Sequence, residues 1–184
     1  MTAASSRQVH GMAPLIRFTL LALYVALVAP LPVMASGDLR RLLWAGGLVG
    51  LLLLVALTSE RVVVDEDGIE VSHPAWCAWC LRRGWQLAWS QVAGLTPVAT
   101  SQGGRVYYVR AKGASNPETP GAPRSYLLPQ RVERFEDFLA RFSALSGVST
   151  EGVSRISPPW TYQVLALMTS LLLVGEAAAL AWPR

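Results

Sequence analysis

Two cysteines form the first group of residues whose spacing could support chemistry. Cys77 and Cys80 make a C-x-x-C pair that Trp76 precedes directly. A redox-active pair of this kind needs its first cysteine at a helix N-terminus after a strand, because the helix dipole there lowers the pKa of the thiol. The surrounding sequence shows no strand–helix–strand pattern. We therefore expect no thiol redox centre.

A metal site is the second kind of chemistry that this segment could support. His73 extends the pair to H-x-x-x-C-x-x-C, but a structural zinc site needs four ligands, and the other histidine, His10, lies beyond an apolar segment. We expect neither a metal at His73, Cys77 and Cys80 nor a cofactor elsewhere. Trp76 and Trp79 indicate instead a hairpin near a bilayer surface, because indole rings favour that interface.

No other pattern predicts catalysis. The sequence has no phosphate-binding glycine loop, no nucleophile elbow and no cluster of carboxylates with a histidine, so we expect neither an enzyme nor a small-molecule substrate. Arg82 and Arg83 are candidates for contact with lipid headgroups. From Ser59 to Pro159 there are 11 Lys or Arg and 10 Asp or Glu, a balance that disfavours nucleic-acid binding.

Apolar segments dominate the rest of the chain. Of the 184 residues, 52% are hydrophobic and only 15% are charged, which predicts an integral membrane protein. Three apolar runs are long enough to span a bilayer: Leu15–Met34, where Pro30 and Pro32 are expected to end the helix, Leu42–Leu57, and Trp160–Trp182. As an alternative, the end of the first run resembles a signal-peptide cleavage site.

These runs divide the chain. We expect an N-terminal tail (1–14), a transmembrane hairpin (15–58, with spans at about 15–34 and 42–58), a soluble domain (59–157) and a third transmembrane helix (158–184). Gly46 and Gly50 form a small-xxx-small pair that would let the hairpin helices approach closely. The flanking arginines slightly favour a cytoplasmic N-terminus and a soluble domain on the cytoplasmic side of an inner (plasma) or thylakoid membrane.

Strand patterns and one helix fill the soluble domain. Arg61–Val64 and Gly68–Ser72 flank a turn, and further strands are predicted at 84–89, 92–98, 105–110 and 125–129. The composition of 113–123 predicts an irregular loop. An amphipathic helix is expected from Gln130 to Ser146, with Gly147 as its stop. Its outer face would carry charged interaction candidates, Arg131, Arg134 and Arg141.

The passage from Trp89 to Leu95, between strands and before a C-terminal helix, resembles bacterial pleckstrin-homology-like (PH-like) domains, whose membrane-anchored members carry a preceding helical hairpin. Thr100–Tyr108 and Tyr126–Pro129 are similar to an uncharacterised cyanobacterial family of membrane proteins. The plan is also similar to that of a photosystem I assembly factor of cyanobacteria and plastids. The resemblance implies an α+β membrane protein in which three transmembrane helices hold a PH-like antiparallel β domain that one amphipathic helix closes.

That resemblance also carries the functional expectations. It implies a non-catalytic scaffold or assembly factor that binds a partner in a membrane-protein complex, such as a photosynthetic one, beside membrane lipids. The alternative is a lipid-binding or membrane-homeostasis module.

Overall fold

The computed structural model describes residues 7–81, 84–101, 104–116 and 119–182. The chain divides into two compact units. The sheet unit comprises Met1–Ala13 and Glu60–Ser157, and the helical unit comprises Pro14–Ser59 and Pro158–Arg184. Each is described in turn.

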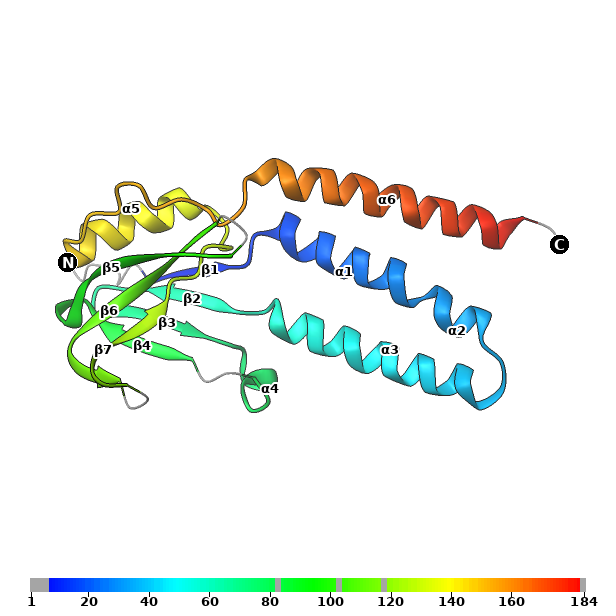
Figure 1. Cartoon of the computed structure of the whole chain (residues 1–184), viewed down its shortest axis with the longest axis horizontal. Helices are drawn as coiled ribbons and strands as arrows, with labels where there is room; N and C mark the ends of the chain where they lie inside the picture. Colours follow the sequence, from blue (N-terminus) through cyan, green and yellow to red (C-terminus); the bar gives the residue numbers. More distant parts are fainter. Residues whose placement is uncertain (1–6, 82–83, 102–103, 117–118, 183–184) are drawn as a thin grey trace, which may run out of the picture. The chain divides into compact units, whose positions relative to one another are not determined.

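The helical unit contains three helical segments that are long and apolar enough to cross a membrane, so the chain is an integral membrane protein, as predicted. They are Pro14–Met34, Gly37–Leu57 and Pro159–Ala181. The first consists of α1 (Pro14–Val28) and α2 (Pro30–Met34), the second is α3 (Gly37–Leu57) and the third is α6 (Pro159–Ala181). Within this unit α1 packs against both α3 and α6 (Figure 1).

Two helix boundaries differ from the prediction. Pro30 ends α1 but begins α2, because proline fits the first turn of a helix, where no earlier carbonyl needs its missing N–H. Helix α3 begins at Gly37, five residues before the expected Leu42. Asp38 lies in its first turn, where the helix dipole favours a carboxylate, and it also pairs with Arg41 at 3.4 Å.

The N-terminal residues, which we expected to form a tail, contain a strand. Strand β1 (Gln8–Gly11) pairs antiparallel with β2 (Arg61–Val64), and His10 lies opposite Val62. Four residues are too few for a clear sequence pattern, and only the distant partner strand defines this one. Because β1 and β2 are neighbours in one sheet, the membrane hairpin is inserted between two paired strands.

The sheet unit contains two antiparallel sheets, in agreement with the predicted α+β class. The first has the order β1-β2-β3-β4, with β3 at Gly68–Ser72 and β4 at Trp85–Ala88. The short 3₁₀ helix η1 (Trp89–Gln91) leads into the second sheet, in which β5 (Val92–Ala99), β6 (Arg105–Asn116) and β7 (Thr119–Leu127) lie in that order.

The expected irregular loop at 113–123 is wrong, because β6 and β7 extend through most of it. The glycine and proline content is accommodated by irregular pairing between Arg110 and Ser115 and by Gly113, whose φ is +68°. The pairing of β6 with β7 gives hydrogen-bond partners to backbone N–H and C=O groups of this segment, which an irregular loop would not provide.

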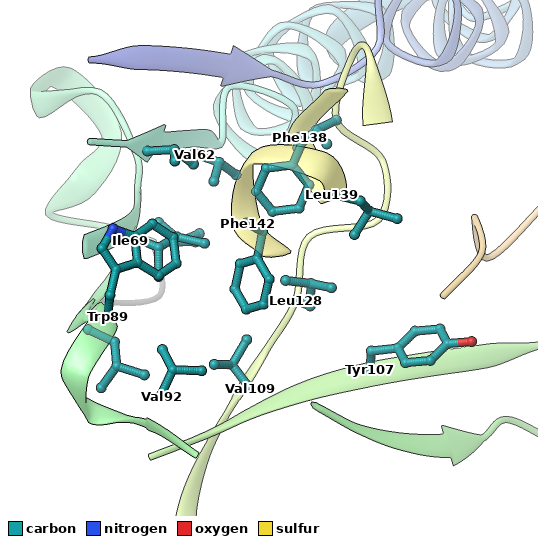
Figure 2. Close-up of a cluster of buried hydrophobic side chains, with 14 of the residues drawn as sticks. Val62, Ile69, Trp89, Val92, Tyr107, Val109, Leu128, Phe138, Leu139 and Phe142 are labelled. Carbon is teal, nitrogen blue, oxygen red and sulfur yellow. The ribbon is translucent and has the colours of Figure 1, made fainter. Parts of the chain in front are cut away.

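Helix α5 (Phe135–Ser146) closes the core of the sheet unit. It begins five residues later than predicted, because Arg134 adopts a left-handed φ of 46° and the preceding Val132 bridges to Met12. Gly147 ends the helix with a φ of +69°, as expected. Figure 2 shows Phe138, Leu139 and Phe142 of α5 among core residues from both sheets, including Val62, Ile69, Val92 and Val109.

Candidate functional site

Trp76 lies on the short helix α4 (Ala75–Ala78), which follows Pro74, and Trp79 is the residue directly after α4. Cys77 is fully buried, whereas Trp76 and Trp79 are 53% and 84% exposed. The indole N–H of Trp79 donates to the carbonyl of Trp76 at 2.9 Å. This bond satisfies the one polar atom of the Trp79 side chain within the turn. The exposed ring is thus an apolar surface without a remaining polar group.

The two cysteines differ in their surroundings. The buried Cys77 thiol donates to the carbonyl of Pro74 at 3.4 Å, and the exposed Cys80 thiol donates to the carbonyl of Cys77 at 3.2 Å. Both are free thiols. Among the described residues, no three His, Cys, Asp or Glu side chains come together as metal ligands, so His73 does not complete a ligand set with them.

His73 lies instead beside a carboxylate. Ser72, which precedes His73, pairs with Arg61 across strands β3 and β2. Glu60 precedes Arg61, and His73 acts electrostatically on its carboxyl. Burial raises the pKa of the Glu60 carboxyl above its ordinary value, and the charges of His73 and Arg131 oppose that rise.

His10 is a buried titratable residue that our sequence analysis used only to argue against a zinc site. Its side chain is 2% exposed and packs edge-to-face against Phe138, with ring centroids 5.7 Å apart. Burial lowers the pKa of His10 below its ordinary value, and a hydrogen-bond interaction with the backbone of Glu133 acts in the opposite direction. In the sequence, only the apolar neighbours Val9 and Met12 indicated that His10 could be buried.

The candidate arginines do not share one environment. Arg131 and Arg134 are exposed, and Arg134 lies 4.0 Å from Glu133, whereas Arg141 is half-buried. The backbone carbonyl of Arg131 accepts a hydrogen bond from the N–H of Ala13 at 2.8 Å. Arg82 and Arg83 lie outside the described residues.

Glycines of α3 lie close to side chains of α1 in the helical unit. A Cβ at Gly50 would collide with the hydroxyl of Tyr24 on α1, whereas a Cβ at Gly46 would meet nothing within 4 Å. Gly47 takes the expected place of Gly46, because its carbonyl accepts a hydrogen bond from Tyr24 at 2.8 Å. Of the predicted pair, Gly50 lies against Tyr24, whereas Gly46 faces open space.

An apolar face on the second sheet was not anticipated. Along β6, Tyr107, Val109 and Ala111 face the core, so the alternate residues Val106, Tyr108 and Arg110 face outward. The strand register adds Thr96 and Leu127 opposite Tyr108 and Val98 opposite Val106. We call this surface the outer sheet face and define it by Thr96, Val98, Val106, Tyr108, Arg110 and Leu127.

The outer sheet face is unusual for a solvated sheet surface, which is ordinarily polar. Val98 and Leu127 are each 44% exposed, and the side chains of Val106 and Tyr108 between them are half-buried. The sequence signal was the run Val106-Tyr107-Tyr108-Val109, in which both faces of the strand are apolar or aromatic. Such a run is typical of a strand that is covered on both sides.

Charge is also unevenly distributed between the sheets. The strands β5, β6 and β7 carry four basic residues and no acidic one, namely Arg105, Arg110, Lys112 and Arg124. The acidic residues Asp65, Glu66, Asp67 and Glu70 lie on β3 or on the turn between β2 and β3. The nearly neutral total that we counted from the sequence conceals a basic second sheet.

Comparison with known proteins gives one informative relative. The chain is 40% identical over 177 residues to the "Uncharacterized protein slr0269" of Synechocystis sp. (strain ATCC 27184 / PCC 6803 / Kazusa). The aligned residues cover 94% of this chain and 85% of that protein. No protein-family model matches the chain. No solved structure matches it either.

Proposed function

We propose that this chain, which belongs to the same family as the cyanobacterial protein slr0269, is a non-catalytic, membrane-anchored scaffold that binds a partner protein. The sheet unit would lie on the cytoplasmic side of an inner or thylakoid membrane. The arrangement of two antiparallel sheets and a closing helix supports the resemblance to PH-like domains. The cyanobacterial origin of the relative supports a photosynthetic complex as the source of the partner.

The observation that carries this proposal is the outer sheet face. A surface that combines exposed aliphatic side chains, a half-buried tyrosine and an arginine has the composition of a protein interface rather than that of a solvated sheet. The Arg110 guanidinium lies 3.6 Å from the position that a Cβ on Gly94 would take, which places this cation over the sheet surface.

Charge favours an acidic partner. Arg110 lies on the outer sheet face, and the described residues of β5, β6 and β7 include no carboxylate. A partner segment that carries Asp or Glu beside apolar residues would therefore complement the outer sheet face in both respects. Such a segment would be attracted at low ionic strength and retained by apolar contact.

The test is affinity purification of the full chain in mild detergent, with two valine variants. Val98→Asp places a carboxylate on the outer sheet face, and Val9→Asp is a matched control on edge strand β1, since the two valines are 44% and 49% exposed. Loss of one buried valine contact is worth about 1.5 kcal/mol or more. That energy corresponds to a roughly tenfold weaker Kd.

We expect a stoichiometric partner protein with the wild type and with Val9→Asp, and its loss with Val98→Asp. Absence of any protein partner from the wild-type preparation would contradict the scaffold proposal. Equal recovery with Val98→Asp and Val9→Asp would show that the outer sheet face is not the binding surface. Circular dichroism of both variants would establish that each one is folded.

A further inference from the structure

We infer that the α4 turn is a membrane-contact element, in which Trp76 and Trp79 insert into the headgroup region of the bilayer. This inference is independent of the scaffold proposal, since it concerns lipid and a different surface. The α4 turn connects β3 and β4 of the first sheet, and none of its residues belongs to the outer sheet face.

The first argument is the state of the Trp79 side chain. Its indole N–H already donates to the Trp76 carbonyl, and 84% of the residue is exposed. Water therefore gains no hydrogen bond from this ring, while the apolar surface remains unfavourably hydrated. Removal of that surface from water would be favourable, and nothing polar on the side chain would have to be desolvated.

The second argument is that the turn is held firmly enough to carry two large exposed rings. Cys77, between the tryptophans, is completely buried, and the N–H groups of Cys77 and Ala78 both donate to the Pro74 carbonyl at 3.0 Å. Leu81 donates back to Cys77 at 3.2 Å. The turn thus fixes Trp76 and Trp79 outward, at spacing i and i+3, on the same side of a helical turn.

The third argument comes from chain connectivity. Ser72, three residues before α4 begins, pairs with Arg61, which follows the last residue of transmembrane helix α3 by four residues. The turn therefore follows the end of β3 that pairs with the first residue of β2, a few residues along the chain from α3. Exposed tryptophan at such a position matches the enrichment of this residue at membrane–water interfaces.

Lipid is favoured over a protein partner for this element. The two exposed rings belong to α4 and to the residue directly after it, and no basic or acidic side chain lies between Ala75 and Trp79 to specify a complementary partner. Interfacial partition of indole requires no such complementarity, because it depends on the aromatic ring and on the depth of the bilayer interface.

Cys80 offers a direct test, because it is exposed beside Trp79 whereas Cys77 is buried. The full chain is purified, labelled at Cys80 with an environment-sensitive thiol fluorophore and reconstituted into vesicles of phosphatidylcholine and phosphatidylglycerol. Quenching is then measured with lipids that carry a nitroxide near the headgroup and, separately, with iodide in the water phase. A Cys77→Ala variant establishes that labelling is confined to Cys80.

The control label is placed at Glu66→Cys in a Cys80→Ser background, because Glu66 is exposed in the turn between β2 and β3. We expect the Cys80 label to be quenched by the nitroxide lipid and protected from iodide, and the Glu66→Cys label to behave in the opposite way. The double variant Trp76→Ser/Trp79→Ser should lose most of the lipid quenching at Cys80, with an unchanged circular dichroism spectrum.

Two results would overturn the inference. Iodide quenching of the Cys80 label that equals that of the Glu66→Cys label would place the turn in water. Protection from iodide without quenching by the nitroxide lipid would show that another copy of the chain, and not lipid, covers the tryptophans. The chain used here is first freed of any co-purifying protein, so neither result depends on the scaffold proposal.

Discussion

The contact between Tyr24 and α3 makes a quantitative prediction for the transmembrane hairpin. Replacement of Gly50 by alanine places a methyl group against the Tyr24 ring, whose Cζ would be 3.0 Å away, with the hydroxyl closer still. The same replacement at Gly46 meets nothing within 4 Å. Because both glycines lie inside α3, the gain in helix propensity is the same for the two variants and cancels in their comparison.

The expected difference follows from two terms. Overpacking of a close contact costs about 1–3 kcal/mol. Displacement of Tyr24 also breaks its hydrogen bond to the Gly47 carbonyl, and such a bond inside a membrane contributes about 0.6 kcal/mol on average. Gly50→Ala should therefore be about 2–3 kcal/mol less stable than Gly46→Ala.

The assay is reversible unfolding of the full chain in mixed micelles, with an increasing mole fraction of sodium dodecyl sulfate. Tyr24→Phe combined with Gly50→Ala completes a double-mutant cycle. Removal of the hydroxyl relieves the closest contact, so this pair should show a coupling energy of about 1 kcal/mol. Equal stability of Gly46→Ala and Gly50→Ala, within about 0.5 kcal/mol, would refute the close packing of Tyr24 on α3.

Four further predictions concern the sheet unit. Burial lowers the pKa of His10, so the free energy of unfolding should fall as the pH drops below 6.5, the ordinary pKa of histidine. Thermal melts from pH 7.5 to pH 5 should show a weaker pH dependence of stability in His10→Phe than in the wild type. The pKa of Glu60 is raised, so stability should fall as pH rises above 4.5, and Glu60→Gln should be more stable than the wild type at pH 7 but equal at pH 4. Phe138→Ala removes a completely buried ring and should lower the free energy of unfolding by about 3–5 kcal/mol in a denaturant titration. Arg134→Gly relieves a left-handed φ of 46° and should raise the free energy of unfolding by about 1 kcal/mol in the same titration.

The helical segments show how much a linear pattern can predict. A bilayer requires about 20 consecutive apolar residues, and this requirement is local, so all three spans could be recognised from composition and length. Their ends were less certain. Helix α3 gained a charged first turn with Asp38, because dipole and ion-pair interactions can extend a helix beyond its apolar core.

The candidate sites depended more on distant contacts. Gly46 and Gly50 satisfied the same sequence rule, but only the rotation of α3 against α1 decides that Gly50 meets Tyr24 and that Gly46 does not. His10 looked like part of a tail because its partner, β2, lies about fifty residues further along the chain, beyond the membrane hairpin. No local pattern contains that information.

By itself, the sequence determined that the chain inserts into a membrane, that a β-rich region lies between the second and third spans, and that an amphipathic helix ends at Gly147. Each of these features follows from periodicity, length or a single residue's conformational preference. The tertiary structure decided which surfaces remain open: the outer sheet face, the basic second sheet and the paired tryptophans of α4. Exposure is a property of neighbours brought together by folding, so it could not be read from spacing along the chain.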